Sequence, residues 1–105
     1  MIKCGIDLVL NKRLEANLKN PDFLRRIFTL KELKQNKKSK LTGIFALKEA
    51  AMKAFGEKLD WKSIEVLAKE GKKPELSINN KKFKSLDASI SHDGDYTIGM
   101  VVVEV

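Results

Sequence analysis

The chain has 105 residues and is 43% hydrophobic, which predicts a single domain over residues 1–105. Its formal net charge of +7 predicts an anionic partner. Its apolar runs are too short to span a bilayer, its N-terminus lacks the pattern of a signal peptide, and its single cysteine, Cys4, excludes an internal disulfide, so we expect a cytoplasmic protein. Nucleic acid has no support as the partner, because aromatic residues are few and zinc-finger, RRM and KH signatures are absent.

The N-terminal segment alternates from Ile2 to Val9, which predicts a β-strand. One face of this strand carries Ile2, Cys4, Ile6 and Leu8, and we expect Cys4 to be a small buried hydrophobe there. Asp7 lies on the other face, inside an otherwise apolar run. It is either a solvated or capping residue, or a carboxylate held on a rigid element where a cation could offset its desolvation.

Helical segments follow the strand. Leu14 and Leu18 are spaced as on one helix face, which predicts a helix from Asn11 to Asn20 that Pro21 ends. Asp22 can cap the short helix that comes next. A capping box, Thr29-Leu30-Lys31-Glu32, then predicts a further short helix.

This N-terminal half is strongly basic. Arg13 and Arg26 contribute to the charge, and Phe23 is interleaved with the arginines. The pattern fits a solvated amphipathic face packed on a core, and it also fits a docking surface for an acidic helix. A polar loop is predicted over Gln35 to Lys40.

The longest helical pattern runs through Phe45 to Gly56, where Gly56 stands at the position of a helix C-cap. At about 100° per residue, one side of the helix is a broad apolar arc of Leu41, Ile44, Leu47, Ala51, Met52 and Phe55. Glu49 and Lys53 are four residues apart and share a face beside this arc. Lys48 falls in the middle of that arc. It either lays its stem on the core and extends its ammonium to water, or it is a functional lysine.

The second half of the chain predicts strands over Ser63 to Leu67, Glu75 to Ile78, Leu86 to His92 and Tyr96 to Val105. The last strand is apolar on both faces, which predicts burial on both sides, including a subunit interface. The order of elements predicts an α+β domain in which an antiparallel sheet packs around the long central helix. His92 is either a structural or exposed residue, or a contact for a phosphate.

Three segments carry a family resemblance: Cys4-Gly5-Ile6-Asp7-Leu8-Val9, the helix Phe45 to Gly56 with its F-x-x-K-E-A-x-x-K pattern, and Ser89-Ile90-Ser91-His92. In this order they resemble the holo-[acyl-carrier-protein] synthase branch of the bacterial 4′-phosphopantetheinyl transferases. The resemblance implies transfer of phosphopantetheine from coenzyme A to a serine of an apo acyl carrier protein in fatty acid biosynthesis, with release of adenosine 3′,5′-bisphosphate.

The resemblance also implies roles for individual residues. Asp7 and Glu49 would hold Mg²⁺, and Lys53 would bind the pyrophosphate or assist proton transfer. Coenzyme A contacts would come from Lys48, Lys53, Gly56 and His92. The general base would be Glu49 or a metal-bound water.

Assembly and partners follow from the same resemblance. The family forms homotrimers with active sites shared between subunits, and it docks an acidic acyl carrier protein. Here Arg13, Phe23 and Arg26 would form the docking surface, and the net charge would steer the carrier. The competing hypothesis is a non-catalytic basic α+β module that binds RNA or an acidic protein.

Overall fold

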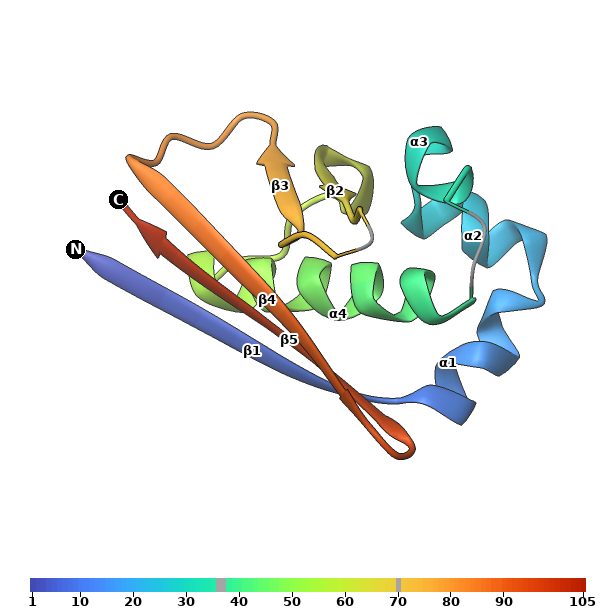
Figure 1. Cartoon of the computed structure of the whole chain (residues 1–105). Coiled ribbons are helices and arrows are strands. Elements are labelled where there is room, and N and C mark those ends of the chain that lie inside the picture. Colours follow the sequence, from blue (N-terminus) through green and yellow to red (C-terminus); the bar gives the residue numbers. More distant parts are fainter. Residues whose placement is uncertain (36–37, 70) are drawn as a thin grey trace.

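The computed structural model describes residues 1–35, 38–69 and 71–105. A three-stranded antiparallel sheet runs through it in the order β1 (Ile2–Leu10), β5 (Tyr96–Glu104) and β4 (Ser85–Asp93), so β1 and β4 are its edges (Figure 1). The chain ends lie side by side at one end of the sheet, where Val105 N–H donates to the carbonyl of Met1. The hairpin between β4 and β5 turns at Gly94, which has a φ of 57°.

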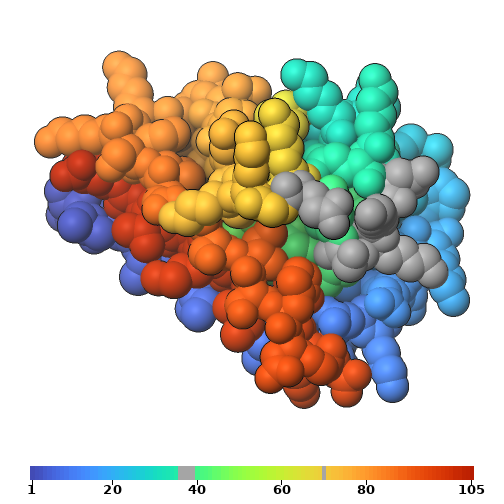
Figure 2. Space-filling model, viewed as in Figure 1, coloured from blue at the N-terminus to red at the C-terminus, as the bar shows by residue number. Residues whose placement is uncertain are grey.

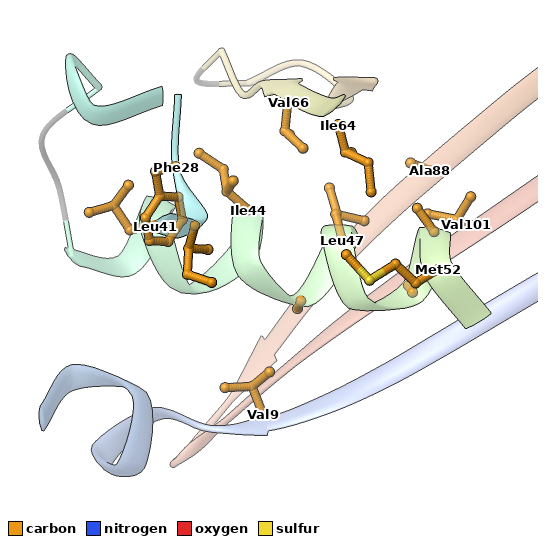
Figure 3. Close-up of a cluster of buried hydrophobic side chains, with 14 of the residues drawn as sticks. Val9, Phe28, Leu41, Ile44, Leu47, Met52, Ile64, Val66, Ala88 and Val101 are labelled. Carbon is orange, nitrogen blue, oxygen red and sulfur yellow. The ribbon is translucent and has the colours of Figure 1, made fainter. Parts of the chain in front are cut away.

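The helix α4 (Lys38–Phe55) crosses one face of this sheet and contacts β1 and β5. A smaller layer covers its other side: the two-stranded sheet of β2 (Ile64–Leu67) and β3 (Glu75–Ile78), with the short η1 (Trp61–Ser63) before β2. The core fills the space around α4 (Figure 3). It includes Val9, Ile44, Leu47, Ile64, Val66 and Val101.

Three short helices lie at one end of α4: α1 (Asn11–Leu18), α2 (Pro21–Ile27) and α3 (Leu30–Leu33). The predicted capping box is confirmed, because Thr29 Oγ1 accepts from Glu32 N–H while the Glu32 side chain accepts from Thr29 N–H. The predicted cap at Asp22 is wrong. Asn20 caps α2 instead, and Pro21 takes the first helical position, where its missing N–H costs nothing.

The predicted fold class is confirmed: the chain is α+β, with an antiparallel sheet packed on a long central helix. Its boundaries need one correction, since α4 already begins at Lys38, inside the segment Gln35 to Lys40 that was predicted to be a loop. Residues 36–37 of that segment lie outside the described residues. None of the described helices is both long and apolar enough to cross a membrane.

Cys4 corrects a second prediction, because it is exposed rather than buried. The face of β1 that packs on α4 is the one with Gly5, Asp7 and Val9. The opposite face carries large apolar side chains into solvent and continues onto β5. Its exposed members are Ile2, Ile6, Leu8, Tyr96, Ile98 and Met100. The predicted two-sided burial of β5 is therefore not present in a single chain.

Candidate active site

The carboxylate of Asp7 meets α4 at the last turn of the helix. Lys53 Nζ lies 3.2 Å from Asp7 Oδ1 and donates to the carbonyl of Ile6 at 3.0 Å. The Asp7 side chain is mostly buried while that of Lys53 is half exposed. The strand and the helix thus bring together two predicted site residues that are 46 positions apart.

Two glycines allow this approach. A Cβ on Gly5 would lie 1.9 Å from the carbonyl oxygen of Ala50, and one on Gly99 would lie 2.7 Å from the carbonyl carbon of Ala46. Gly99 is paired directly with Asp7 in the β1–β5 register. Backbone therefore packs on backbone at this crossing, and β1 is close enough for Asp7 to reach α4.

Glu49 faces the same region. Asp7 and Glu49 both line a pocket of about 210 Å³. Burial raises the pKa of Glu49, the negative charge of Asp7 raises it further, and the cations Lys53 and Lys58 act in the opposite direction. A divalent cation bound between the two carboxylates would relieve their mutual repulsion.

The donor set fits Mg²⁺. Carboxylate oxygens are the hard ligands this ion prefers, and it commonly takes one or two of them and completes its octahedron with water and phosphate oxygens. No group of three or more acidic, cysteine or histidine ligands occurs in residues 1–35, 38–69 and 71–105. The pair Asp7 and Glu49 is therefore suited to an ion shared with a phosphorylated substrate, rather than to a closed structural site.

Glu49 also lines a second pocket, of about 520 Å³. Lys53, Gly56 and Lys58 border this pocket. Gly56 has a φ of 70° and ends α4, which confirms the predicted C-cap. Two lysines and the open backbone of Gly56 therefore lie next to Glu49. The positive charge of the lysines would favour the binding of an anionic ligand there.

Of the predicted docking residues, Arg13 borders the first pocket, while Phe23 and Arg26 lie beyond its lining. Arg13 is exposed on α1 and lines that pocket together with Asp7 and Glu49. On α2, the guanidinium of Arg26 lies 5.8 Å from the centre of the Phe23 ring. The Phe23 ring in turn lies 6.3 Å from that of Phe45, which lines the pocket.

Lys48 is not part of this group. Its side chain is fully buried, Nζ lies 2.6 Å from Glu32 Oε1, and Nζ donates to the carbonyls of Ile27 and Trp61 at 2.7 and 3.0 Å. All three donors of the ammonium are used, so no surface is left for a phosphate. Both interpretations of Lys48 from the sequence, an ammonium in water and a contact for coenzyme A, disagree with this position.

Glu32 is the partner that sequence reasoning missed. Besides Lys48, its carboxylate accepts from the N–H groups of Thr29 and Val66, at 2.9 and 2.8 Å. The capping box marked Glu32 as a helix-start residue, but that local signal does not reveal what lies on the other side of the carboxylate.

His92 lies at the other edge of the sheet, near the end of β4. It borders a pocket of about 420 Å³ whose lining includes four lysines. The charged members of that lining are Lys40, Lys69, Lys72 and Lys73. These lysines were not predicted as site residues. Because β1 and β4 are opposite edges of one sheet, a single chain keeps the Asp7–Glu49 pair and the basic pocket of His92 apart.

Comparison with known proteins identifies the family of this chain. The family model of the 4′-phosphopantetheinyl transferase superfamily matches residues 3–101, and the chain belongs to that superfamily. Membership favours the transferase interpretation of the sequence over the non-catalytic binding module.

Individual relatives point to one branch of the superfamily. The holo-[acyl-carrier-protein] synthase of Finegoldia magna is 34% identical over 97% of this chain and 95% of its own length. That of Listeria welshimeri is 34% identical over the full length of both chains. A crystal structure of the Helicobacter pylori holo-[acyl-carrier-protein] synthase in complex with coenzyme A superposes with a TM-score of 0.85 at 34% identity, and it covers 99% of this chain and 100% of the other.

Proposed function

We propose that the chain, as one domain over residues 1–105, is a cytoplasmic enzyme that transfers the 4′-phosphopantetheine group of coenzyme A to a serine of an acidic apo acyl carrier protein. One observation carries the proposal: Asp7, Glu49 and Lys53 converge at one place in a chain that is similar over its whole length to holo-[acyl-carrier-protein] synthases.

The reaction is a phosphoryl transfer. The serine Oγ attacks the β-phosphorus of the coenzyme A pyrophosphate, the bond to adenosine 3′,5′-bisphosphate breaks, and the serine proton passes to a base. Mg²⁺ held by Asp7 and Glu49 would neutralise negative charge on the reacting phosphate. Lys53 is half exposed beside Asp7 and can donate to the same phosphate oxygens. Glu49, or a water molecule beside the ion, would accept the serine proton.

Two features support a homotrimer with shared active sites. An apolar face on β1 and β5 is open to solvent in the single chain, and large exposed apolar patches are typical of protein interfaces. The carboxylate pair and the basic pocket of His92 lie at opposite edges of the sheet. A neighbouring subunit would bring the second edge to the first, so that coenzyme A contacts both.

The carrier would dock on the Arg13 side of the site. Arg13 lines the pocket of the carboxylate pair, so an acidic helix held there places its serine next to the reacting phosphate. The exposed Arg26 and the Phe23 ring beneath it would extend the surface along α2. Fatty acid biosynthesis is the pathway that such a carrier implies.

Intact mass spectrometry tests the activity. Purified protein, coenzyme A and Mg²⁺ are mixed with an apo acyl carrier protein, and the carrier should gain the mass of one phosphopantetheine unit. Asp7→Asn should reduce the rate by about 10²- to 10³-fold, as expected when one electrostatic contact to a transition state is lost. An unmodified carrier, across several carriers and divalent metals, would contradict the proposal.

A separate measurement tests the ion. Mg²⁺ binding to the folded chain should raise its thermal midpoint in proportion to the logarithm of the Mg²⁺ concentration, and Asp7→Asn should remove the rise. An equal rise in the variant would place the ion elsewhere.

A further inference from the structure

We propose that Thr97 and Asn11 are positioning residues, which hold His92 with a proton on Nδ1 and leave Nε2 as the ring nitrogen that faces a ligand in the basic pocket. The tautomer follows from the hydrogen bonds alone. Its effect on coenzyme A rests on the proposed function.

The three side chains form a hydrogen-bonded row. His92 Nδ1 lies 2.9 Å from Thr97 Oγ1, and Thr97 Oγ1 donates to Asn11 Oδ1 at 2.7 Å. A threonine hydroxyl has a single proton. Because that proton goes to Asn11, Thr97 Oγ1 can only accept from the histidine, and Nδ1 must carry a proton.

The row is fixed at both ends. Thr97 lies directly opposite His92 in the β4–β5 register and is 1% exposed, so its hydroxyl cannot turn to water. Asn11 begins α1, and its backbone N–H donates to the carbonyl of Asp95 at 2.8 Å. The tip of the β4–β5 hairpin therefore lies against the start of α1, as Figure 2 shows for the two surfaces.

The other ring nitrogen has a different environment. The imidazole is exposed and borders the pocket lined by lysines, and no described residue bonds Nε2. In the neutral ring Nε2 has a free lone pair. In the imidazolium its N–H points in one fixed direction, because the Nδ1–H remains on Thr97. A phosphate oxygen of a ligand in this pocket would meet a donor whose orientation is already set, which lowers the entropic cost of binding.

The chain offers a direct measurement, because His92 is its only histidine. With ¹⁵N-labelled histidine, the spectrum contains one pair of ring nitrogens, whose chemical shifts distinguish a protonated from an unprotonated nitrogen. At a pH well above about 6.5, where imidazole is ordinarily neutral, the wild-type protein should show a protonated Nδ1 and a bare Nε2. The opposite assignment would overturn the proposal, whether or not the protein transfers phosphopantetheine.

Matched variants test the roles of the two partners. Thr97→Val keeps the shape and removes the hydroxyl, so the neutral ring should lose its preference for the Nδ1–H tautomer, while Thr97→Ser should retain it. Asn11→Ala frees the threonine proton to be donated to Nδ1, so the tautomer should reverse, while Asn11→Asp should retain it. The Asn11 pair decides the matter if Thr97→Val does not fold. Identical spectra for Asn11→Ala and Asn11→Asp would refute the row.

Steady-state kinetics connect the tautomer to the ligand. Thr97→Val should raise the KM for coenzyme A by about 2- to 10-fold, the factor that corresponds to one ordinary hydrogen bond, while kcat changes less. Thr97→Ser should restore the wild-type KM. An altered tautomer with an unchanged KM for coenzyme A would show that the row serves only the hairpin, and would overturn its role in ligand positioning.

Discussion

In the candidate site, burial shifts the pKa of Glu49 away from its ordinary value. Its pKa is raised above the ordinary value of about 4.5 by burial and by Asp7. A carboxyl with a raised pKa in the folded state binds a proton more tightly there than in the unfolded chain. Ionisation of Glu49 therefore opposes folding: the metal-free protein loses this part of its stability as the pH rises from about 4.5 through the raised pKa, and none of it is lost below that window.

Glu49→Gln removes this ionisation and should stabilise the metal-free protein at pH 7, with a smaller or absent effect at pH 4. The same variant should slow transfer by about 10²-fold or more, because it removes a ligand of the ion and a proton acceptor. Urea denaturation at both pH values measures the first effect, and intact mass of the carrier measures the second. Glu75→Gln, at an exposed position of β3, is the control and should change neither. A destabilised Glu49→Gln at pH 7 would contradict the argument.

Among the elements, the buried pair of Lys48 and Glu32 joins the short helices to α4 and to β2. The pair bonds the carbonyl of Ile27 at the end of α2, Thr29 at the start of α3 and the N–H of Val66 in β2. Burial lowers the pKa of the Lys48 ammonium, and the hydrogen bond and charge of Glu32 oppose that shift. The buried ion pair thus connects α2, α3 and β2 to α4, and both of its charges are shielded from water.

Removal of either partner leaves the other charge buried without compensation. Lys48→Met and Glu32→Gln should each lower the free energy of unfolding by roughly 3–5 kcal/mol. The exposed pair of Lys73 and Asp87 supplies a matched control, and Lys73→Met should change the free energy of unfolding much less than Lys48→Met. Chemical denaturation of the three variants gives the comparison. Equal costs for Lys48→Met and Lys73→Met would show that the buried pair contributes no more than a surface contact.

Local signals in the sequence predicted the elements well, while the orientation of β1 was predicted poorly for a physical reason. The capping box and the glycine C-cap of α4 depend on neighbouring residues only. The face of β1 toward α4 contains Gly5 and Asp7, because the close helix leaves no room for a large side chain. Its apolar face is the open one, so a rule that assigns hydrophobic residues to the core selects the wrong side and buries Cys4.

Some residues of the candidate site were predicted from the sequence and others were not. Asp7, Glu49 and Lys53 were assigned to the site through the family resemblance, and they are close together in the structure. Lys48 belongs to the same motif, yet its partner Glu32 is 16 positions away and reaches it only through the packing of α3 on α4. Residues on turns and loops, such as Lys69, Lys72 and Lys73 near His92, have no periodic pattern, and only the pocket that they line revealed them.

The contact between β1 and α4 leads to a prediction about Gly5. Gly5→Ala would place a methyl group 1.9 Å from the Ala50 carbonyl oxygen, so the strand must move away and take Asp7 with it. We expect lower stability, by roughly 1–3 kcal/mol as for other overpacked sites, and a loss of transfer rate. Gly43→Ala is the control: it meets only the flexible end of Ile90 and improves helix propensity. Thermal denaturation and the transfer rate of the two variants measure the difference, and equal rates would show that Gly5 does not position Asp7.

At the scale of the whole molecule, the sheet presents its catalytic candidates at one edge and its basic pocket at the other, with an open apolar face between them. Cyclic assembly of identical chains solves such a division, because each interface joins one edge to the opposite edge of the next subunit. Cys4 lies on the open apolar face and reports on it. In the proposed trimer its thiol should react slowly, and it should react quickly once the trimer dissociates.

Subunit mixing tests the shared site. Glu49→Gln damages only the carboxylate pair beside β1, and His92→Ala damages only the basic pocket at the β4 edge. A mixed assembly can therefore combine an intact carboxylate pair from one chain with an intact basic pocket from another. In random cyclic trimers from equal amounts of the two chains, about one quarter of the sites combine two intact edges. The co-refolded mixture should therefore regain about one quarter of wild-type activity, above the average of the two variants alone. Glu49→Gln mixed with Asp7→Asn is the control, since both changes affect the same edge and should not complement. Mixed trimers that are detected by native mass spectrometry but remain inactive would show that each site is built within one chain.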